Sequence, residues 1–469
     1  MSEAETSRLV ELLARRAAET PTRMAVIDVR GSAGWTFREL MATSAERRRY
    51  LPASPGAVAL AVDNTAFCPW FLALRAAGRP VILMDAQPAA DLKRQTCRAL
   101  GVDVLIHGRG PNVEVEALAG VEVRPAPPGT DVVKLTSGST GAPAGLCFAE
   151  DELLIGFRQI AEGMEIDGDD RILLAIPLTH SYGFDNGLLS LAVAGTPLIL
   201  ESRIFPRDLH RAVRAGEATF LPLVPPLVGA LAAVPWTDLP SLRRVICAGG
   251  VLAPEAGAAF FAASGLHVHN FYGSSETGGI CFERAPEAAE AAGTVGRPLP
   301  GVRLDLDGDG RVTVHSAANR RALWGDGKAL AAADRAVRTG DLGVLEAGRL
   351  RLVGRATRRL NIGGRKVAAE GIEAALRRLD GVRDAAVVGV PDSMRGDRVV
   401  AFLVTDGRDI DLSSLPAGQR PRAWRRLDAL PLSPRGKVDR RALEQMAQAA
   451  SGSASGRASE VAEASVGRR

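Results

Sequence analysis

Cysteine is scarce in this sequence, and long apolar runs are absent. The five cysteines form no C-x-x-C pair and are odd in number, which argues against a disulfide framework or a zinc site and suits a reducing compartment. No apolar run reaches the roughly 18 residues of a membrane-spanning helix. The N-terminus has acids and arginines at helical spacing, unlike a signal peptide. These absences predict a cytoplasmic protein without a membrane span.

An excess of charge of one sign is also lacking. The formal net charge is +4 over 469 residues, which gives no reason to expect nucleic acid as a partner. The basic residues are nearly all arginine, and the lysines are Lys93, Lys134, Lys328, Lys366 and Lys437. Where arginine is used so freely, a lysine can mark a site that needs a compact point charge, although chance is the preferred explanation for most of these lysines.

The rest of the composition, 46% hydrophobic and 24% charged, is that of a globular chain long enough for two or three domains. Apolar strand segments alternate with helical segments, which predicts an α/β fold with parallel-rich sheets covered by helices. Strands are expected at 58–62, 81–84, 103–107, 132–135, 172–176, 197–200 and 244–247, and helices at 7–18, 67–77 and 187–193, with another helix capped near Thr36.

The pattern changes after about residue 300, where short strands and turns predict a small β-structure. A compact C-terminal unit follows, with a helix expected at 370–379 and strands at 385–390 and 399–404. We place a domain boundary at about residue 355. The end of the chain, which opens with QAASGSASGR, is small and polar and is predicted to be disordered from residue 447.

The stretch LTSGSTGAPAG, residues 135–145, lies between two expected strands and is rich in glycine and hydroxyl groups. Glycines let backbone N–H groups turn toward an anion, and the hydroxyls add donors, so the loop suits a phosphate group. The spacing of a Walker loop is absent. A polar surface hairpin is the alternative, because Gly, Ser, Thr and Pro are ordinary turn residues. The loop alone leaves both interpretations open.

Further motifs occur in a fixed order along the chain. They are PLTHSYG (177–183), NFYGSSETGG (270–279), GTVGRPLPG (293–301), RTGDL (338–342), Gly354-Arg355 and PRGK (434–437). With the loop, they resemble the adenylate-forming superfamily, which contains acyl- and aryl-CoA synthetases, adenylation domains of nonribosomal peptide synthetases, and firefly luciferase. The resemblance runs from about residue 36 to about residue 443. Each motif alone is weak, but the ordered series is specific.

The resemblance implies a chemistry and a domain organisation. A carboxylic acid attacks the α-phosphate of ATP, pyrophosphate leaves, and an acyl-adenylate forms; a thiol, of coenzyme A or a separate carrier protein, then takes the acyl group. Mg²⁺ is the implied metal. The implied domains are an N-terminal adenylation domain at 1–354 and a small, mobile α+β C-terminal lid at 355–446, followed by the tail at 447–469.

Individual residues match positions with known roles in the family. Lys437 matches the catalytic lysine of the lid, Glu276 the acid that holds Mg²⁺, and His180 a position beside the acyl pocket. Asp341 matches the acid that binds the ribose hydroxyls, and Arg355 an arginine near the hinge. The other implied nucleotide-binding residues are Thr136, Ser137, Gly138, Ser139, Thr140, Gly141, Gly249, Tyr272, Gly273 and Ser275.

The acyl pocket is less well defined. The resemblance places Phe184, Asp185, Gly250 and Gly279 at or near it. In relatives that activate amino acids, an aspartate in this region pairs with the substrate ammonium, and Asp185 has that potential. The simpler interpretation is that Asp185 caps a helix, because aspartate is favoured at the N-cap.

The sequence departs from the family pattern at several positions. Ala144 stands where the loop usually has lysine, which predicts weaker contacts to the outer phosphates with the backbone cradle retained. Thr357 stands at the hinge position, where Asp or Lys is common. The lid is also short between Val404 and Leu430.

Three functions are therefore compared. The first is an acid ligase that forms a thioester, and the second is an adenylating enzyme with a non-thiol acceptor such as an amine, which the altered lid motivates. The third is a degenerate nucleotide-binding protein with little turnover, which Ala144 motivates. Retention of Glu276, Asp341 and Lys437 argues against the third.

Overall fold

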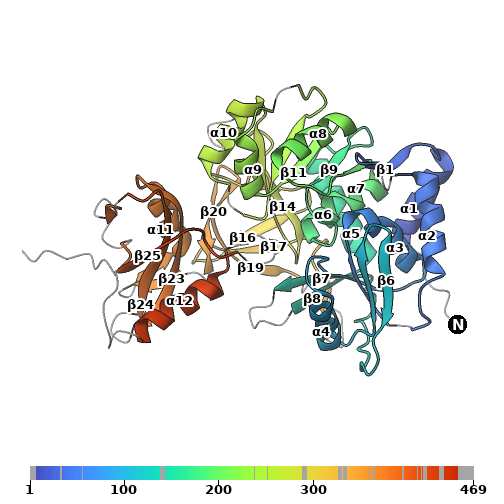
Figure 1. Cartoon of the computed structure of the whole chain (residues 1–469), viewed down its shortest axis with the longest axis horizontal. Helices are drawn as coiled ribbons and strands as arrows, with labels where there is room; N and C mark the ends of the chain where they lie inside the picture. The colour runs from blue at the N-terminus through green and yellow to red at the C-terminus, as the bar shows by residue number, and fades with distance from the viewer. Residues whose placement is uncertain are drawn as a thin grey trace, which may run out of the picture. The chain divides into compact units, whose positions relative to one another are not determined.

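The computed structural model describes residues 7–31, 34–54, 56–137, 143–236, 238–250, 252–287, 293–325, 330, 335–356, 359–362, 365–392, 396–408, 410–412, 415, 420–432 and 438–452 (Figure 1). These residues belong to two compact units. The first comprises Met1–Asp305, Thr313–Arg338 and Leu345–Arg351, and the second Leu306–Val312, Thr339–Val344 and Leu352–Arg469. The longest segment of the second unit thus begins at Leu352, near the predicted domain boundary at 355.

A seven-stranded sheet in the first unit has the order β18-β8-β7-β4-β3-β5-β6. Its strands are β3 (Val58–Val62), β4 (Val81–Leu83), β5 (Val104–Arg109), β6 (Asn112–Ala117), β7 (Val132–Ser137), β8 (Pro143–Phe148) and β18 (Ala322–Leu323). The central strands β7, β4, β3 and β5 are parallel, and β6, β8 and β18 pair antiparallel. All five residues of β3 are buried, as the continuous apolar sequence VALAV predicts.

A nine-stranded sheet has the order β15-β14-β13-β12-β11-β9-β10-β1-β2. Its strands are β1 (Met24–Asp28), β2 (Trp35–Thr36), β9 (Ile172–Leu174), β10 (Leu198–Leu200), β11 (Phe220–Leu223), β12 (Arg244–Cys247), β13 (Val268–Ser274), β14 (Gly278–Phe282) and β15 (Arg297–Pro298). The pairs from β1 through β10, β9, β11 and β12 to β13 are all parallel. The predicted parallel-rich sheets are confirmed.

Helices cover these sheets and also lie between them (Figure 1). They are α1 (Arg8–Glu19), α2 (Phe37–Arg48), α3 (Asn64–Ala76), α4 (Ala90–Leu100), α5 (Glu150–Met164), α6 (Ser181–Asn186), α7 (Leu188–Val193), α8 (Pro206–Gly216), α9 (Pro225–Ala232) and α10 (Pro254–Ser264). Helix α5 contacts β8 of the seven-stranded sheet and β14 of the nine-stranded sheet. It therefore packs between the two sheets, which explains why most of its residues are buried.

The start of α2 shows how local sequence sets an element. The Thr36 hydroxyl accepts a hydrogen bond from the Glu39 N–H at 3.2 Å, and the Glu39 carboxylate accepts one from the Thr36 N–H at 2.8 Å. This capping box satisfies two backbone donors that the first turn leaves without helical partners. The predicted cap is confirmed.

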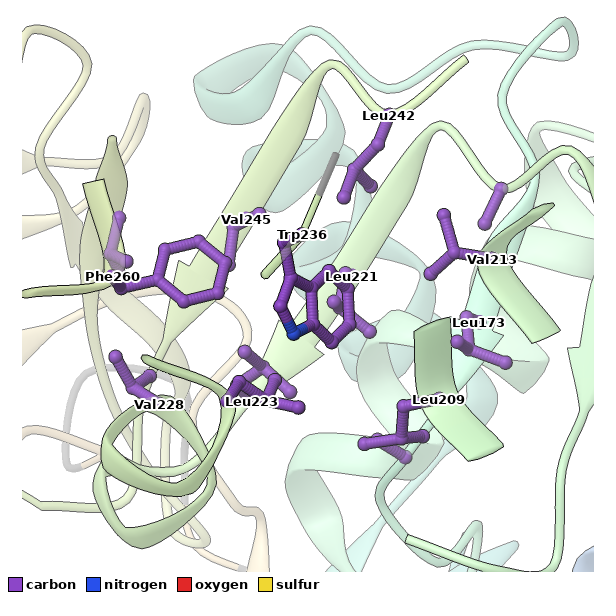
Figure 2. Close-up of a cluster of buried hydrophobic side chains, with 14 of the residues drawn as sticks. Leu173, Leu209, Val213, Leu221, Leu223, Val228, Trp236, Leu242, Val245 and Phe260 are labelled. Carbon is purple, nitrogen blue, oxygen red and sulfur yellow. The ribbon is translucent and has the colours of Figure 1, made fainter. Parts of the chain in front are cut away.

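Trp236 lies at the centre of a buried apolar cluster between α8, α9, α10 and the strands beneath them (Figure 2). Its indole is 1% exposed and packs near the Phe260 ring, at 5.9 Å between centroids. The cluster also contains Leu173, Leu209, Val213, Leu221, Leu223, Val228, Leu242 and Val245. This core supports the carboxyl ends of β11 and β12, where open parallel sheets bind ligands.

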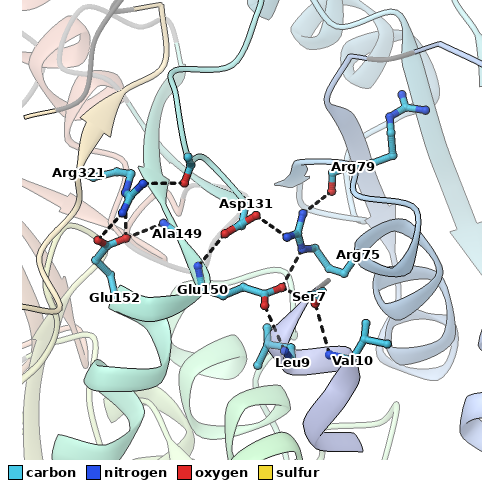
Figure 3. Close-up of polar contacts among 11 residues, drawn as sticks. Ser7, Leu9, Val10, Arg75, Arg79, Asp131, Ala149, Glu150, Glu152 and Arg321 are labelled. Atoms are coloured by element: carbon cyan, nitrogen blue, oxygen red, sulfur yellow. Dashed lines mark hydrogen bonds and ion pairs between the residues drawn. The ribbon is translucent and has the colours of Figure 1, made fainter. Parts of the chain in front are cut away.

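A buried polar network joins the N-cap of α1, helix α3, the residue before β7 and the start of α5 (Figure 3). The Arg75 guanidinium donates to Glu150 at 2.9 Å and to the Arg79 carbonyl at 2.8 Å, and it also pairs with Asp131. Glu150 accepts in addition from the Ser7 hydroxyl at 2.6 Å. The side chains of Arg75 and Glu150 are each 5% exposed, so every buried charge in this network depends on its partners.

A four-stranded sheet has the order β16-β17-β19-β20, with β16 (Arg303–Leu306), β17 (Arg311–His315), β19 (Val337–Glu346) and β20 (Arg349–Arg355). The predicted small β-structure is thus present. A further sheet, formed by the longest segment of the second unit, consists of β21 (Arg359–Ile362), β22 (Arg365–Ala368), β23 (Val382–Asp392), β24 (Gly396–Thr405) and β25 (Ala423–Leu427). β25 lies parallel to β24, within the segment that the sequence marked as short.

Two helices cover opposite faces of this last sheet. Ala385 and Val387 of β23 belong to a core with α11 (Ala369–Arg377), and Ala386 and Val388 to a core with α12 (Arg440–Gly452). The alternation follows from the two-residue period of a strand. Helix α12 continues to Gly452, so helical structure extends past residue 447, where the tail was predicted to begin.

Candidate active site

The strands β7 and β8 form the antiparallel hairpin that carries the glycine-rich loop. Thr136 lies opposite Ala144 and Ser137 opposite Pro143, and the Thr136 hydroxyl donates to the Ala144 carbonyl at 3.4 Å. The tip of the hairpin is outside the described residues, so the roles of Gly138, Ser139, Thr140 and Gly141 stay predictions. Ala144 is therefore part of the strand pairing at the base of the loop.

The PLTHSYG motif forms a turn before α6 that hydrogen bonds hold in place. The Asn64 side chain accepts from the Leu178 N–H at 2.7 Å, and the His180 N–H donates to the Pro177 carbonyl at 3.0 Å. A Cβ at Gly183 would lie 2.2 Å from that same carbonyl oxygen, so only glycine fits there. The turn leaves the His180 imidazole 3.6 Å from the Asp85 carboxylate.

The NFYGSSETGG motif forms the tight turn between β13 and β14. Ser275 and Glu276 lie in the turn, which the Ser274 and Thr277 hydroxyls close at 3.0 Å. A Cβ at Gly273 would lie 2.7 Å from the Gly278 carbonyl oxygen, so the turn depends on this glycine. Tyr272, on β13, is 7% exposed. Most of its ring is thus covered, and stacking on adenine stays a prediction.

Side-chain contacts join these segments within the first unit. The Ser181 hydroxyl of α6 donates to the Ser275 hydroxyl of the β13–β14 turn at 3.0 Å, and the Tyr182 and Phe271 rings lie 5.9 Å apart. The Lys134 ammonium of β7 binds the Asp185 carboxylate of α6. The strand that leads into the loop, the helix after His180 and the turn with Glu276 therefore form one connected region.

Glu276, the predicted magnesium ligand, lies in a turn that a backbone hydrogen bond holds in place. Its backbone carbonyl accepts from the Arg320 N–H at 2.8 Å, which holds the turn. Within the described residues, no hydrogen bond or ion pair reaches its carboxylate, and no group of three or more His, Cys, Asp and Glu forms a metal site. Mg²⁺ prefers one or two carboxylates combined with phosphate oxygens and water, so Glu276 fits this ion.

The glycines predicted at the nucleotide and acyl sites differ in environment. Gly249 follows the carboxyl end of β12 with φ of 81°, and Gly250 next to it is also exposed. Gly279 is buried, and a Cβ there would lie 2.7 Å from Leu299 and 2.8 Å from Ile160. The space beside Gly279 is thus filled by apolar side chains.

One prediction for α6 needs correction. Asp185 is the fifth residue of α6 and caps neither α6 nor α7, because the chain enters α6 at His180. Its carboxylate is bound by Lys134, so it is not an unpaired partner for a substrate ammonium. The Phe184 side chain is fully buried against the Phe67 and Phe71 rings of α3, and its place beside the acyl pocket stays a prediction.

The second unit holds the predicted ribose and hinge residues. The Arg355 guanidinium donates to the Asp341 carboxylate at 2.8 Å, and the Asp341 N–H donates to the Thr339 hydroxyl at 3.1 Å. Lys437 and Thr357 lie outside the described residues, and their roles stay predictions. The sequence assigned Asp341 and Arg355 separately, and the structure shows that they form an ion pair.

Sequence reasoning missed Lys134, Asp85 and Ser181 as parts of this region. Only Lys134 carried a signal, because lysine is scarce among the basic residues. Asp85 and Ser181 are ordinary polar residues in the sequence, and only their contacts with His180 and Ser275 reveal them.

Comparison with known proteins identifies the family. Residues 13–317 match the AMP-binding enzyme family, and residues 371–437 match the AMP-binding enzyme C-terminal domain. A methyl-dioxo-octahydro-indenyl-propanoyl:CoA ligase of Mycobacterium tuberculosis is 31% identical over 351 residues, covering 71% of this chain and 69% of the relative.

Solved structures show the same fold. ATP-bound MatB from Rhodopseudomonas palustris superposes with a TM-score of 0.79 at 20% identity, covering 93% of this chain and 98% of that chain. The amide bond synthetase McbA from Marinactinospora thermotolerans superposes with a TM-score of 0.76 at 25% identity, covering 93% of this chain and 99% of that chain. No described helix is long and apolar enough to cross a membrane. The chain belongs to the AMP-binding enzyme family of ATP-dependent, adenylate-forming acid ligases.

Proposed function

We propose that the protein activates a carboxylic acid with ATP and transfers the acyl group to a thiol of coenzyme A or of a separate carrier protein. The observation that carries the proposal is the β13–β14 turn, where the Glu276 carboxylate has no partner among the described residues and Ser275 is bonded to α6.

The five cysteines are buried free thiols, and a cytoplasmic location is proposed because such thiols suit a reducing compartment.

In the first half-reaction, a substrate carboxylate oxygen forms a bond to the α-phosphorus, and the bond to the pyrophosphate leaving group breaks. The negative charge that develops on the phosphate oxygens must be stabilised by hydrogen-bond donors and cations that are already in position. We propose that Ser275 donates to an α-phosphate oxygen while Ser181 holds its hydroxyl. Glu276 would hold Mg²⁺, which would supply positive charge to the phosphate oxygens. In the second half-reaction, the thiol sulfur attacks the acyl carbon, and AMP leaves.

The test is pyrophosphate exchange into ATP, measured over a panel of carboxylic acids without acceptor, followed by mass spectrometry of thioesters formed with coenzyme A. Acid-dependent exchange with thioester formation supports the proposal. If exchange occurs but a product forms only when an amine is supplied, the acceptor is an amine and not a thiol. ATP binding without exchange for any acid would instead indicate a nucleotide-binding protein with little turnover.

Glu276→Gln should raise the Mg²⁺ concentration needed for half-maximal exchange and lower the rate. The amide keeps the shape of the side chain but removes the charge that holds the ion. A Mg²⁺ titration of the exchange rate checks this, with Glu255→Gln in the first turn of α10 as the control. An unchanged Mg²⁺ dependence would show that Glu276 is not the ligand.

Ala144→Lys should tighten ATP binding severalfold to about tenfold, because a charge-assisted contact to phosphate contributes about 1.5–3 kcal/mol when desolvated and less when exposed. Lys134 does not already provide this charge, since its ammonium is buried against Asp185. Isothermal titration with a non-hydrolysable ATP analogue checks the affinity, and Ala144→Met controls for side-chain bulk. Equal affinity of all three proteins would mean that position 144 does not face the outer phosphates.

We also expect an acid without an α-ammonium group to be the better substrate. The buried Lys134–Asp185 pair has no net charge with which to attract a cation. A carboxylic acid should therefore support exchange at least about tenfold better than its α-amino derivative, since an unpaired charge in a desolvated site costs several kcal/mol. Exchange assays with matched pairs of acids measure the ratio, and a preference for the amino acids would contradict the expectation.

A further inference from the structure

Lys134 and Asp185 form a buried ion pair between β7 and α6. The Lys134 ammonium lies 2.6 Å and 2.9 Å from the two Asp185 oxygens, and their side chains are 2% and 9% exposed. The ammonium also lies 4.8 Å from the centroid of the Phe148 ring and 5.7 Å from that of Phe184. Aromatic faces attract cations, so the surroundings hold the charge of Lys134 in one place.

A buried ion pair of this kind is expected to add little net stability to the fold. Burial raises the pKa of the Asp185 carboxyl, and the Lys134 ammonium opposes this increase. Because both charges leave water, a buried pair is often no more stabilising than well-packed apolar residues of similar volume. A buried pair does, however, restrict the relative position of the two backbones that carry it, because its hydrogen bonds are directional.

The pair lies where three segments of the proposed active site meet. Lys134 is on β7, which leads directly into the glycine-rich loop, and Asp185 is one helical turn after Ser181, whose hydroxyl donates to Ser275. A Cβ at Gly278 would lie 3.9 Å from the Asp185 carboxylate. The turn that carries Ser275 and Glu276 therefore packs close to the ion pair.

We propose that Lys134 and Asp185 are positioning residues for acyl-adenylate formation. Their ion pair fixes α6 against β7, so that the Ser181–Ser275 hydrogen bond keeps the geometry that in-line attack at the α-phosphate requires. This inference rests on the proposed function. A displacement of about 1 Å in an active site can cost about 100-fold in rate, so a small shift of α6 is sufficient.

The test compares Lys134→Met, Asp185→Leu and the double variant with the wild type, measuring thermal stability together with kcat and KM for pyrophosphate exchange. Each single variant leaves an uncompensated polar or charged group and should lose both stability and rate. The double variant should regain most of the melting temperature, while its kcat stays at least about tenfold below that of the wild type with little change in KM for ATP. A wild-type kcat in the double variant would overturn the inference.

A second ion pair, between the Arg30 side chain, which is 30% exposed, and the fully buried Glu201 carboxylate, provides the control. Arg30 donates to Glu201 at 2.7 Å, and the Glu201 side chain is 0% exposed, but this pair lies beyond the ends of β1 and β10. Arg30→Met should lower the melting temperature and leave kcat of the folded protein unchanged. A fall in kcat as large as in the Lys134 and Asp185 variants would show that any lost buried pair has this effect and would overturn the inference.

Chemical rescue decides the matter if the double variant does not fold. In Asp185→Ala, formate can enter the space left by the side chain and pair with the Lys134 ammonium, so it should restore exchange at least about tenfold over an equal concentration of chloride. Absence of rescue would overturn the inference. If the wild-type protein supported pyrophosphate exchange with none of the acids tested, the proposed function itself would be wrong. This outcome separates the two failures.

Discussion

Arg75→Met is expected to lower the free energy of unfolding by about 3–5 kcal/mol, because removing one partner leaves buried charges uncompensated. The Arg75 guanidinium contacts both Glu150 and Asp131, and its own side chain is 5% exposed (Figure 3). Loss of the guanidinium also removes the hydrogen bond to the Arg79 carbonyl. Denaturant unfolding followed by tryptophan fluorescence measures the change, since Trp70 and Trp236 are buried in the first unit.

An exposed ion pair across the same helices serves as the control. Arg8 of α1 pairs with Asp151 of α5, and their side chains are 64% and 57% exposed. Arg8→Met should change the unfolding midpoint little, because exposed pairs are well solvated. If Arg75→Met were as harmless as Arg8→Met, the buried network would contribute no stability, and the argument from its burial would be wrong.

Lys437→Ala is expected to reduce the rate of adenylate formation by about 100-fold or more, which corresponds to about 3 kcal/mol of transition-state stabilisation. The resemblance to the family assigns Lys437 to the lid, where a mobile ammonium can bridge the substrate carboxylate and the α-phosphate and reduce their repulsion. The contact is needed mainly in the transition state, so ATP should still bind. Pyrophosphate exchange measures the rate, and calorimetric titration measures the binding.

The control for this variant is Arg441→Ala, which removes an exposed positive charge from α12 close by in the sequence. It should exchange pyrophosphate at the wild-type rate. Exchange at the wild-type rate in Lys437→Ala would instead show that this lysine is not the catalytic cation. Loss of ATP binding together with activity would mean that Lys437 contributes to binding the ground state as well.

Local sequence patterns predicted many strands and some helices of the fold, but not α4, α5, α8, α9 or α10. The strand at 244–247 has the predicted bounds as β12, and the Thr36 cap forms as its sequence indicates. Such features depend on residues close together in the chain: apolar periodicity, capping side chains and turn glycines. The ordered motifs also identified the family, which the comparisons confirm.

The arrangement of charges in the candidate site was not predictable in the same way. Aspartate is common at helix starts, so the sequence favoured Asp185 as a cap, yet the residue lies in the fifth position of α6 and binds Lys134, 51 residues away. Ser181 and Ser275 are 94 residues apart and meet through a hydrogen bond.

The sequence by itself determined the family, the alternation of strands and helices, and the residue types available for chemistry, because each of these follows from local periodicity or from motifs in a fixed order. Only the tertiary structure decided which charges neutralise one another. Pairing a buried ammonium with a buried carboxylate depends on how β7 and α6 pack, and the cost of an unpaired buried charge makes that packing, rather than local propensity, set the electrostatics of the site.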